Sequence, residues 1–127
     1  MKQITRQLSL FEDETIRQVM QAGALVSSIK EAMREELAKS KYSRPQVVDR
    51  INSISAKIGK RLTQGNKKEI TLDTLDKWLN PKEMEHVPGL LALQVFMLAV
   101  DTLAPLEAWL ALFGCGILTP TDKMSLE

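Results

Sequence analysis

Basic side chains dominate one stretch of this sequence, from Lys39 to Lys68. The stretch holds nine Lys or Arg residues and a single acid, Asp49, so its net charge is +8, whereas the whole chain carries only +1. The nine bases are Lys39, Lys41, Arg44, Arg50, Lys57, Lys60, Arg61, Lys67 and Lys68. A strong local charge on a nearly neutral chain indicates a polyanionic partner, and the phosphates of nucleic acid are the first candidate. The alternative is a solvated lysine-rich surface with no partner.

Residues suited to catalysis are few. His86 is the single histidine and Cys115 the single cysteine, so no His/Cys cluster has the spacing of a metal site. Glu35 and Glu36 are adjacent, and neighbouring helical residues point about 100° apart, so they cannot form a facing acid–base pair. No glycine-rich loop follows a strand to hold phosphate. We therefore predict no enzyme activity, no cofactor and no metal.

A pentapeptide near the N-terminus resembles the motif by which bacterial replication and repair proteins dock on the sliding clamp. Its residues are Gln7, Leu8, Ser9, Leu10 and Phe11. In such a complex Leu10 and Phe11 would enter an apolar pocket, and the Gln7 amide would fix the orientation of the peptide. The alternative is that Leu8 and Phe11 pack the first helix onto the core.

Composition predicts a single globular domain. The chain has 127 residues, of which 44% are hydrophobic and 26% charged, and its low aromatic content favours helix over sheet. A lone cysteine excludes a disulfide within the chain and fits a reducing cytoplasm. No export signal opens the sequence, and the longest apolar stretch, 87–100, contains Pro88 and Gly89 and is too short to cross a bilayer. We expect a cytoplasmic protein without a membrane partner.

Apolar periodicity and capping residues predict two helices in the first half of the chain. Apolar residues at four-residue steps predict a helix over 24–39; they are Leu25, Ile29, Met33 and Leu37. Ser43 and Gln46 match a capping box, with Pro45 in the first turn, and Gly59 is suited to end the second helix. The apolar stripe of this second helix consists of Val47, Ile51, Ile54 and Ile58.

Three further helices are predicted in the second half. Thr71 is suited to begin a helix over 72–79, whose buried face would be Leu72, Leu75, Trp78 and Leu79. Pro88 should start a helix that runs to about Val100 and is apolar on nearly every side, as a central core helix would be. A last helix is expected over 103–113.

These elements predict an all-α bundle of about five helices, containing a helix-turn-helix-like pair with a long intervening loop. We expect a flexible N-terminal tail over 1–14, one helical domain over 15–118 and a C-terminal tail over 119–127. Within the domain, the helix-turn-helix-like part would span 24–80 and an apolar helical hairpin 88–114.

Part of this chain resembles a known family. Residues Tyr42–Ile51 resemble the first helix of the helix-turn-helix in lambda-repressor-like proteins. Residues Ile70–Trp78 resemble the following helix in small proteins of Mu-like phages and prophages, and 88–120 is similar to the C-terminal half of that group. The resemblance implies a DNA-binding protein whose second motif helix enters the major groove, and a transcriptional or replication regulator of phage or prophage type.

The expected partner is double-stranded DNA. The candidate contact residues are Arg44, Gln46, Arg50, Lys57, Lys60, Arg61, Lys67, Lys68, Thr74 and Lys77. Thr74 and Lys77 could contact base edges, whereas most of the basic residues suit phosphates. Because the second motif helix also carries Asp73 and Asp76, which repel phosphate, contact with the DNA backbone is favoured over base reading.

Two other functions stay open at this point. The first is a protein-interaction module that acts on the host replication machinery through the sliding-clamp motif. The second is a helical assembly protein that uses Leu90–Val100 as a dimer surface. A homodimer is also compatible with the first hypothesis, because two-fold dimers double the contact with DNA.

Overall fold

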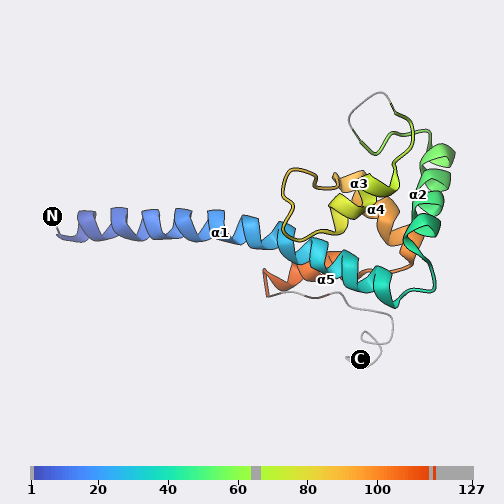
Figure 1. The fold of residues 1–127 in the computed structure, drawn as a ribbon. Helices are drawn as coiled ribbons and strands as arrows, with labels where there is room; N and C mark the ends of the chain where they lie inside the picture. Colours follow the sequence, from blue (N-terminus) through green and yellow to red (C-terminus); the bar gives the residue numbers. More distant parts are fainter. Residues whose placement is uncertain (1, 64–66, 115, 117–127) are drawn as a thin grey trace, which may run out of the picture.

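The computed structural model describes residues 2–63, 67–114 and 116, and among its first 22 residues it describes the side chains of Glu14 and Arg17 alone. The helices are α1 (Lys2–Lys39), α2 (Arg44–Ile58), α3 (Leu72–Leu79), α4 (Leu90–Val100) and α5 (Ala104–Ala111) (Figure 1). No strand occurs in the described ranges, which confirms the predicted all-α bundle of about five helices. Over the same ranges, no helix combines the length and apolar character needed to cross a membrane.

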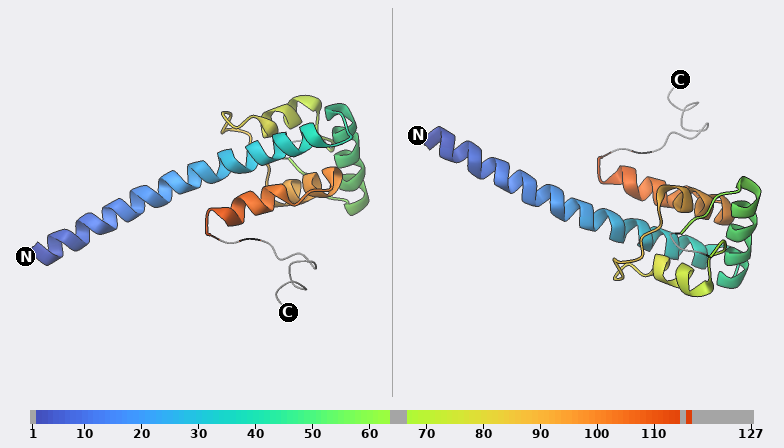
Figure 2. Two further views of the ribbon diagram at one scale, coloured as in Figure 1. Left: turned by 90° about the horizontal axis from the view of Figure 1, so that it is seen from below. Right: turned by 90° about the horizontal axis from the view of Figure 1, so that it is seen from above.

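The long helix α1 has one half inside the bundle and one half outside it. Its C-terminal half buries Ile29, Met33 and Leu37 in the core, as the apolar period predicts. This half packs against α5 and α3. Figure 2 shows α1 and α5 side by side, with the N-terminal half of α1 continuing beyond the bundle.

The helical backbone of residues 2–14 differs from the tail predicted there. The sequence of this segment has no sustained apolar period, and such a period predicts only those helices that bury one face. A helix can also form because its residues have high helix propensity. The segment Lys2–Ala22 contains no proline or glycine and is rich in residues with good helix propensity. Once the packed half of α1 has formed, each added residue gains one hydrogen bond without a new nucleation step. The helix therefore extends beyond the residues that the core holds.

The predicted caps of α2 are confirmed. The Gln46 amide donates to the Ser43 hydroxyl at 3.3 Å, and the Ser43 amide donates to the Gln46 side-chain oxygen at 2.8 Å, which completes the capping box. At the other end, Gly59 adopts the left-handed conformation with φ 65°, which glycine accepts without strain. The predicted stripe was wrong at Ile58, which is 43% exposed because the last turn of α2 reaches beyond the core.

The loop between α2 and α3 is fastened to α2 near both of its ends. At its start, the Ser55 hydroxyl donates to the Lys60 carbonyl at 2.5 Å. At its end, the Asn52 side chain donates to the Ile70 carbonyl at 3.0 Å and accepts from the Ile70 amide at 2.8 Å. Asn52 thus pairs with the backbone of Ile70 as a neighbouring strand would, and it brings the buried Ile70 side chain into the core.

Helix α3 begins and ends as predicted. The Thr74 amide donates to the Thr71 hydroxyl at 3.2 Å, and Asn80 follows the last turn. Trp78 and Leu79 are buried together with Leu75. Leu72 is 41% exposed, which corrects its assignment to the buried face, because it lies in the first turn at the edge of the core.

Helix α4 lies in the core and packs against α2 and α5. It begins at Leu90, two residues after the predicted start, with Gly89 in the capping position. Asp101 ends it in the left-handed conformation with φ 61°. The last helix runs from Ala104 to Ala111, slightly shorter than predicted.

The double hydrogen bond of Asn52 should contribute measurably to stability. Replacing Asn52 with Ala leaves the amide and carbonyl of Ile70 without these partners, which should cost about 1–3 kcal/mol in the free energy of unfolding. Urea denaturation followed by circular dichroism measures this difference. Ser53→Ala, at an exposed neighbouring position on α2, is the matched control and should change the value little.

Candidate nucleic-acid interface

The helices that resemble a helix-turn-helix are joined by an ion pair. Arg44 at the start of α2 lies 2.6 Å from the Asp76 carboxylate on α3, and both side chains are about half exposed. Within α3, the Lys77 ammonium lies 3.1 Å from the Asp73 carboxylate. These two pairs occupy Lys77, the only basic residue of α3, and Arg44, one of the three basic residues of α2. The face of α3 is therefore close to electrically neutral.

Arg50 is exposed but engaged by the bundle. Its Nε donates to the Ala99 carbonyl at 2.7 Å, near the C-terminal end of α4, where carbonyls lack helical partners. Its guanidinium also lies 4.3 Å from the centre of the Tyr42 ring, a cation–π distance. The cation of Arg50 thus stabilises the junction of α2 and α4.

Two uncharged residues of the predicted interface also have local partners. Gln46 completes the cap of α2, and the Thr74 hydroxyl lies 3.2 Å from the Thr71 hydroxyl. Gln46 is hydrogen-bonded to the Ser43 backbone and Thr74 to the Thr71 hydroxyl. Each would have to give up this hydrogen bond to contact a DNA base.

A different group of predicted bases remains exposed. These are Lys57 in the last turn of α2 and Lys60, Arg61, Lys67 and Lys68 in the loop that follows. Across the described parts of the chain, the ammonium groups of the four lysines have no ion-pair or hydrogen-bond partner. The last turn of α2 and the loop that follows it lie on the side of the bundle away from α1 (Figure 1). We call Lys57, Lys60, Arg61, Lys67 and Lys68 the basic end.

An open groove of about 920 Å³ lies between the basic end, the start of α3 and the segment before α4. Arg61, Lys67 and Thr74 line it, so the fold brings three of the predicted contact residues to one hollow. Its other wall is apolar and includes Leu90. The acids Glu69, Asp73 and Glu85 also border the groove, so its lining carries both signs of charge.

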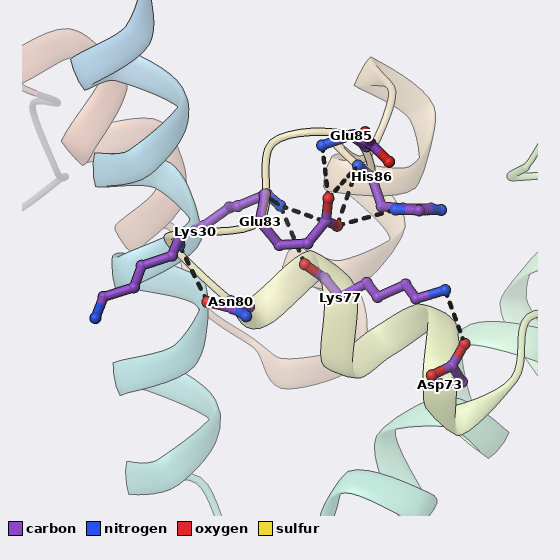
Figure 3. Close-up of polar contacts among 8 residues, drawn as sticks. Lys30, Asp73, Lys77, Asn80, Glu83, Glu85 and His86 are labelled. Atoms are coloured by element: carbon purple, nitrogen blue, oxygen red, sulfur yellow. Dashed lines mark hydrogen bonds and ion pairs between the residues drawn. The ribbon is translucent and has the colours of Figure 1, made fainter.

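A polar cluster that the sequence did not predict lies at the opposite end of α3 (Figure 3). Lys30 projects from α1 and is fully buried. Its ammonium donates to the Lys77 carbonyl at 3.0 Å and to the Glu83 carbonyl, and it lies 4.0 Å from the Glu83 carboxylate. Lys30 therefore satisfies a carbonyl in the last turn of α3 and fixes the loop that follows.

The electrostatics of this cluster follow from burial and hydrogen bonding. Burial lowers the pKa of the Lys30 ammonium below its ordinary value, although the Glu83 carboxylate acts in the opposite direction. Partial burial alone would raise the pKa of the Glu83 carboxyl, but hydrogen bonds from the Glu85 amide and the His86 side chain outweigh it. Together with the charges of His86 and Lys30, they hold this pKa below its usual range.

Glu83, Glu85 and His86 also present ligand atoms that lie within 4.8 Å of one another. His86 Nδ1 is 3.0 Å from a Glu83 carboxylate oxygen, and the amides of Glu85 and His86 donate to the same carboxylate. His86 is thus about half exposed and paired with Glu83. These hydrogen bonds account for the arrangement, and the absence of a bound metal remains a prediction.

The remaining predicted site residues lie at the ends of the chain. Gln7–Phe11 falls in the part of α1 outside the bundle, and the structure describes the helical backbone of these five residues but not their side chains. Cys115 and residues 119–127 lie outside the described residues.

Comparison with known proteins identifies no relative: no family, no curated protein and no solved structure matches this chain. The resemblance to phage helix-turn-helix proteins therefore remains a prediction.

The Glu83 carboxylate should make stability depend on acidity. Its lowered pKa means that it stabilises the fold fully above the unfolded value of 4.5 and loses this contribution as pH falls through the folded value. We expect the free energy of unfolding to fall as pH decreases below about 4.5, and to fall less in Glu83→Gln. Urea denaturation at several pH values tests this, with Glu85→Gln as the control; equal slopes in wild type and Glu83→Gln would contradict it.

Proposed function

We propose that this protein binds double-stranded DNA through the basic end and contacts mainly the phosphate backbone. The observation that carries the proposal is the set of exposed lysines at one end of α2, which have no partner in the described residues. Lysine neutralises phosphates as a mobile point charge and carries little sequence information. Binding should therefore be strong at low salt and only weakly selective for sequence.

The ion pairs of α2 and α3 support backbone contact over base reading. A recognition helix needs side chains that reach base edges, and α3 offers Thr74 and Lys77, both engaged locally. The loop between α2 and α3 is also much longer than the usual turn of a helix-turn-helix. We propose that α3 supports the basic end from the side, and that a role in transcription or replication of phage or prophage type follows from the resemblance of 42–51 and 70–78.

Removing the exposed lysines should weaken DNA binding and its dependence on salt. The variant that replaces Lys57, Lys60, Lys67 and Lys68 with Gln loses up to four phosphate contacts. Each contact contributes a slope of about 0.9 in the logarithm of affinity against the logarithm of salt concentration, so the slope should fall by about three to four units. Fluorescence anisotropy with a labelled duplex at several salt concentrations measures both quantities.

Lys82→Gln is the matched control, because Lys82 is exposed on the loop after α3 and lies outside the basic end. It should leave affinity and slope nearly unchanged. Negligible binding of the wild type at low salt, or an affinity that does not fall as salt rises, would disprove DNA binding. If the variant with all four lysines replaced binds DNA as tightly as the wild type, the basic end is not the binding site.

A second candidate function is docking on the bacterial sliding clamp through Gln7–Phe11. The observation that favours it is the position of this segment on the half of α1 that extends beyond the bundle (Figure 2). A backbone outside the core can leave the helix at low cost, and a helix end without tertiary packing is marginally stable in water. The segment could thus become extended and insert Leu10 and Phe11 into a pocket of the clamp.

Clamp capture tests this second function. Full-length wild type should retain purified bacterial sliding clamp, whereas Leu10→Ala/Phe11→Ala should lose most of it, because the apolar anchors of such a peptide supply most of the binding energy. Ile4→Ala/Ile16→Ala truncates two apolar residues of the same helix outside the pentapeptide and should retain the clamp. Equal capture by the wild type and by Leu10→Ala/Phe11→Ala would exclude the motif.

A further inference from the structure

Helix α4 has an exposed apolar face although it lies in the core. Its eleven residues include no charged side chain. One side buries residues such as Val95, Phe96 and Ala99. The other side leaves Leu90 74% exposed and Leu98 57% exposed, with the exposed Gln94 midway between them. An exposed apolar face of this kind marks an interaction surface.

The order of residues on this face is symmetric about Gln94. Leu90 and Leu98 lie four residues before and after Gln94 on the same helical face. Half-buried Leu91 and Met97 lie three residues before and after it. A contact between two copies across a two-fold axis requires that each residue meet its counterpart reciprocally. In an antiparallel helix pair crossing at Gln94, leucine meets leucine on both sides of the axis.

We propose that this face binds a second copy of the chain, with the two α4 helices antiparallel and Gln94 on the two-fold axis. A glutamine amide has donor and acceptor groups, so two Gln94 side chains can hydrogen-bond to each other at the axis. The absence of charge on α4 means that the two copies do not repel each other there. It also argues against nucleic acid as the occupant, because a surface that binds nucleic acid needs Lys or Arg side chains to neutralise the phosphates.

A hollow beside the exposed face fits the same arrangement. It has a volume of about 530 Å³, lies between the end of α4 and the start of α5, and is lined by residues that include Met97, Leu98 and Leu103. In the antiparallel pair, Leu90 of the second copy lies opposite Leu98 and beside this hollow. The most exposed leucine of α4 thus meets the apolar side of this hollow, whose other side is formed by Gln94, Asp101 and Thr102, and symmetry repeats the contact.

The size of the face sets the strength of the dimer. An eleven-residue helix is about 16 Å long, so the contact lies at the low end of specific interfaces. Small interfaces of this type are weak and depend on concentration. The dimer should therefore form in the micromolar range and dissociate on dilution. It does not depend on DNA binding, and either proposal can fail without the other.

Sedimentation equilibrium of the full chain, from low to several hundred micromolar protein, tests the dimer. Wild type should show a monomer–dimer equilibrium. Gln94→Glu places two carboxylates against each other at the axis and should raise the dissociation constant about tenfold or more. Gln94→Lys should do the same with two ammonium groups. Leu72→Glu, at an exposed leucine on α3, is the control and should dimerise as wild type does.

Mixing the two charged variants identifies the axis. If residue 94 faces residue 94, an equimolar mixture of Gln94→Glu and Gln94→Lys should recover a heterodimer at concentrations where each alone is monomeric. Circular dichroism of both variants confirms that they are folded, which the exposure of Gln94 leads us to expect.

Three results would overturn the proposal. Wild type that stays monomeric at the highest concentration excludes the dimer and leaves the face to a different partner. A dimer that Gln94→Glu does not weaken uses another surface, such as the N-terminal half of α1. Charged variants that do not recover association on mixing exclude the antiparallel arrangement about Gln94.

Discussion

The buried ammonium of Lys30 holds together three parts of the chain that are distant in sequence. It joins α1 to the last turn of α3 and to the loop that leads to α4. Helix α3 has only eight residues, and a helix of that length is unstable in water without tertiary contacts. A cation at its C-terminal end offsets the partial negative charge of the carbonyls there. The cost of burying Lys30 is thus balanced by the backbone groups that it satisfies.

The fold divides the basic residues into two groups with different tasks. Arg44 and Arg50 on α2 bind groups on α3 and α4, and so they stabilise the packing of the helices. The lysines of the basic end remain in contact with solvent. Charge density along the sequence cannot make this distinction, because it depends on which acids and carbonyls the fold brings near. Part of the positive charge of 39–68 is therefore used to hold the helices together, and fewer charges than the sequence suggests remain available to a ligand.

Local signals in the sequence predicted α2 to α5 to within a few residues but missed the N-terminal half of α1, and they could not predict long-range contacts. The caps at Ser43, Gly59 and Thr71 act on residues within one turn, so their pattern is visible in the sequence and the structure confirms it. The hydrogen bond from Lys30 to the Lys77 carbonyl joins residues 47 positions apart in sequence, and the one from Arg50 to the Ala99 carbonyl joins residues 49 positions apart. Lys30 reads in sequence as an ordinary surface lysine between apolar positions. Only the packing of α1 against α3 shows that it is buried.

The two hydrogen bonds between Asn52 and Ile70 allow the loop before α3 to change in length without a change in the packing of the bundle. Since Ser55 holds the start of this loop and Asn52 its end, the two anchor points stay in place whatever number of residues connects them. Chain entropy changes slowly with loop length, and doubling a flexible loop costs only about 0.6 kcal/mol. Insertions or deletions between 61 and 69 would therefore alter the reach of the loop while the helices keep their packing. The fold would therefore tolerate a grafted peptide or a fluorescent label in this loop, provided that the lysines of the basic end are kept.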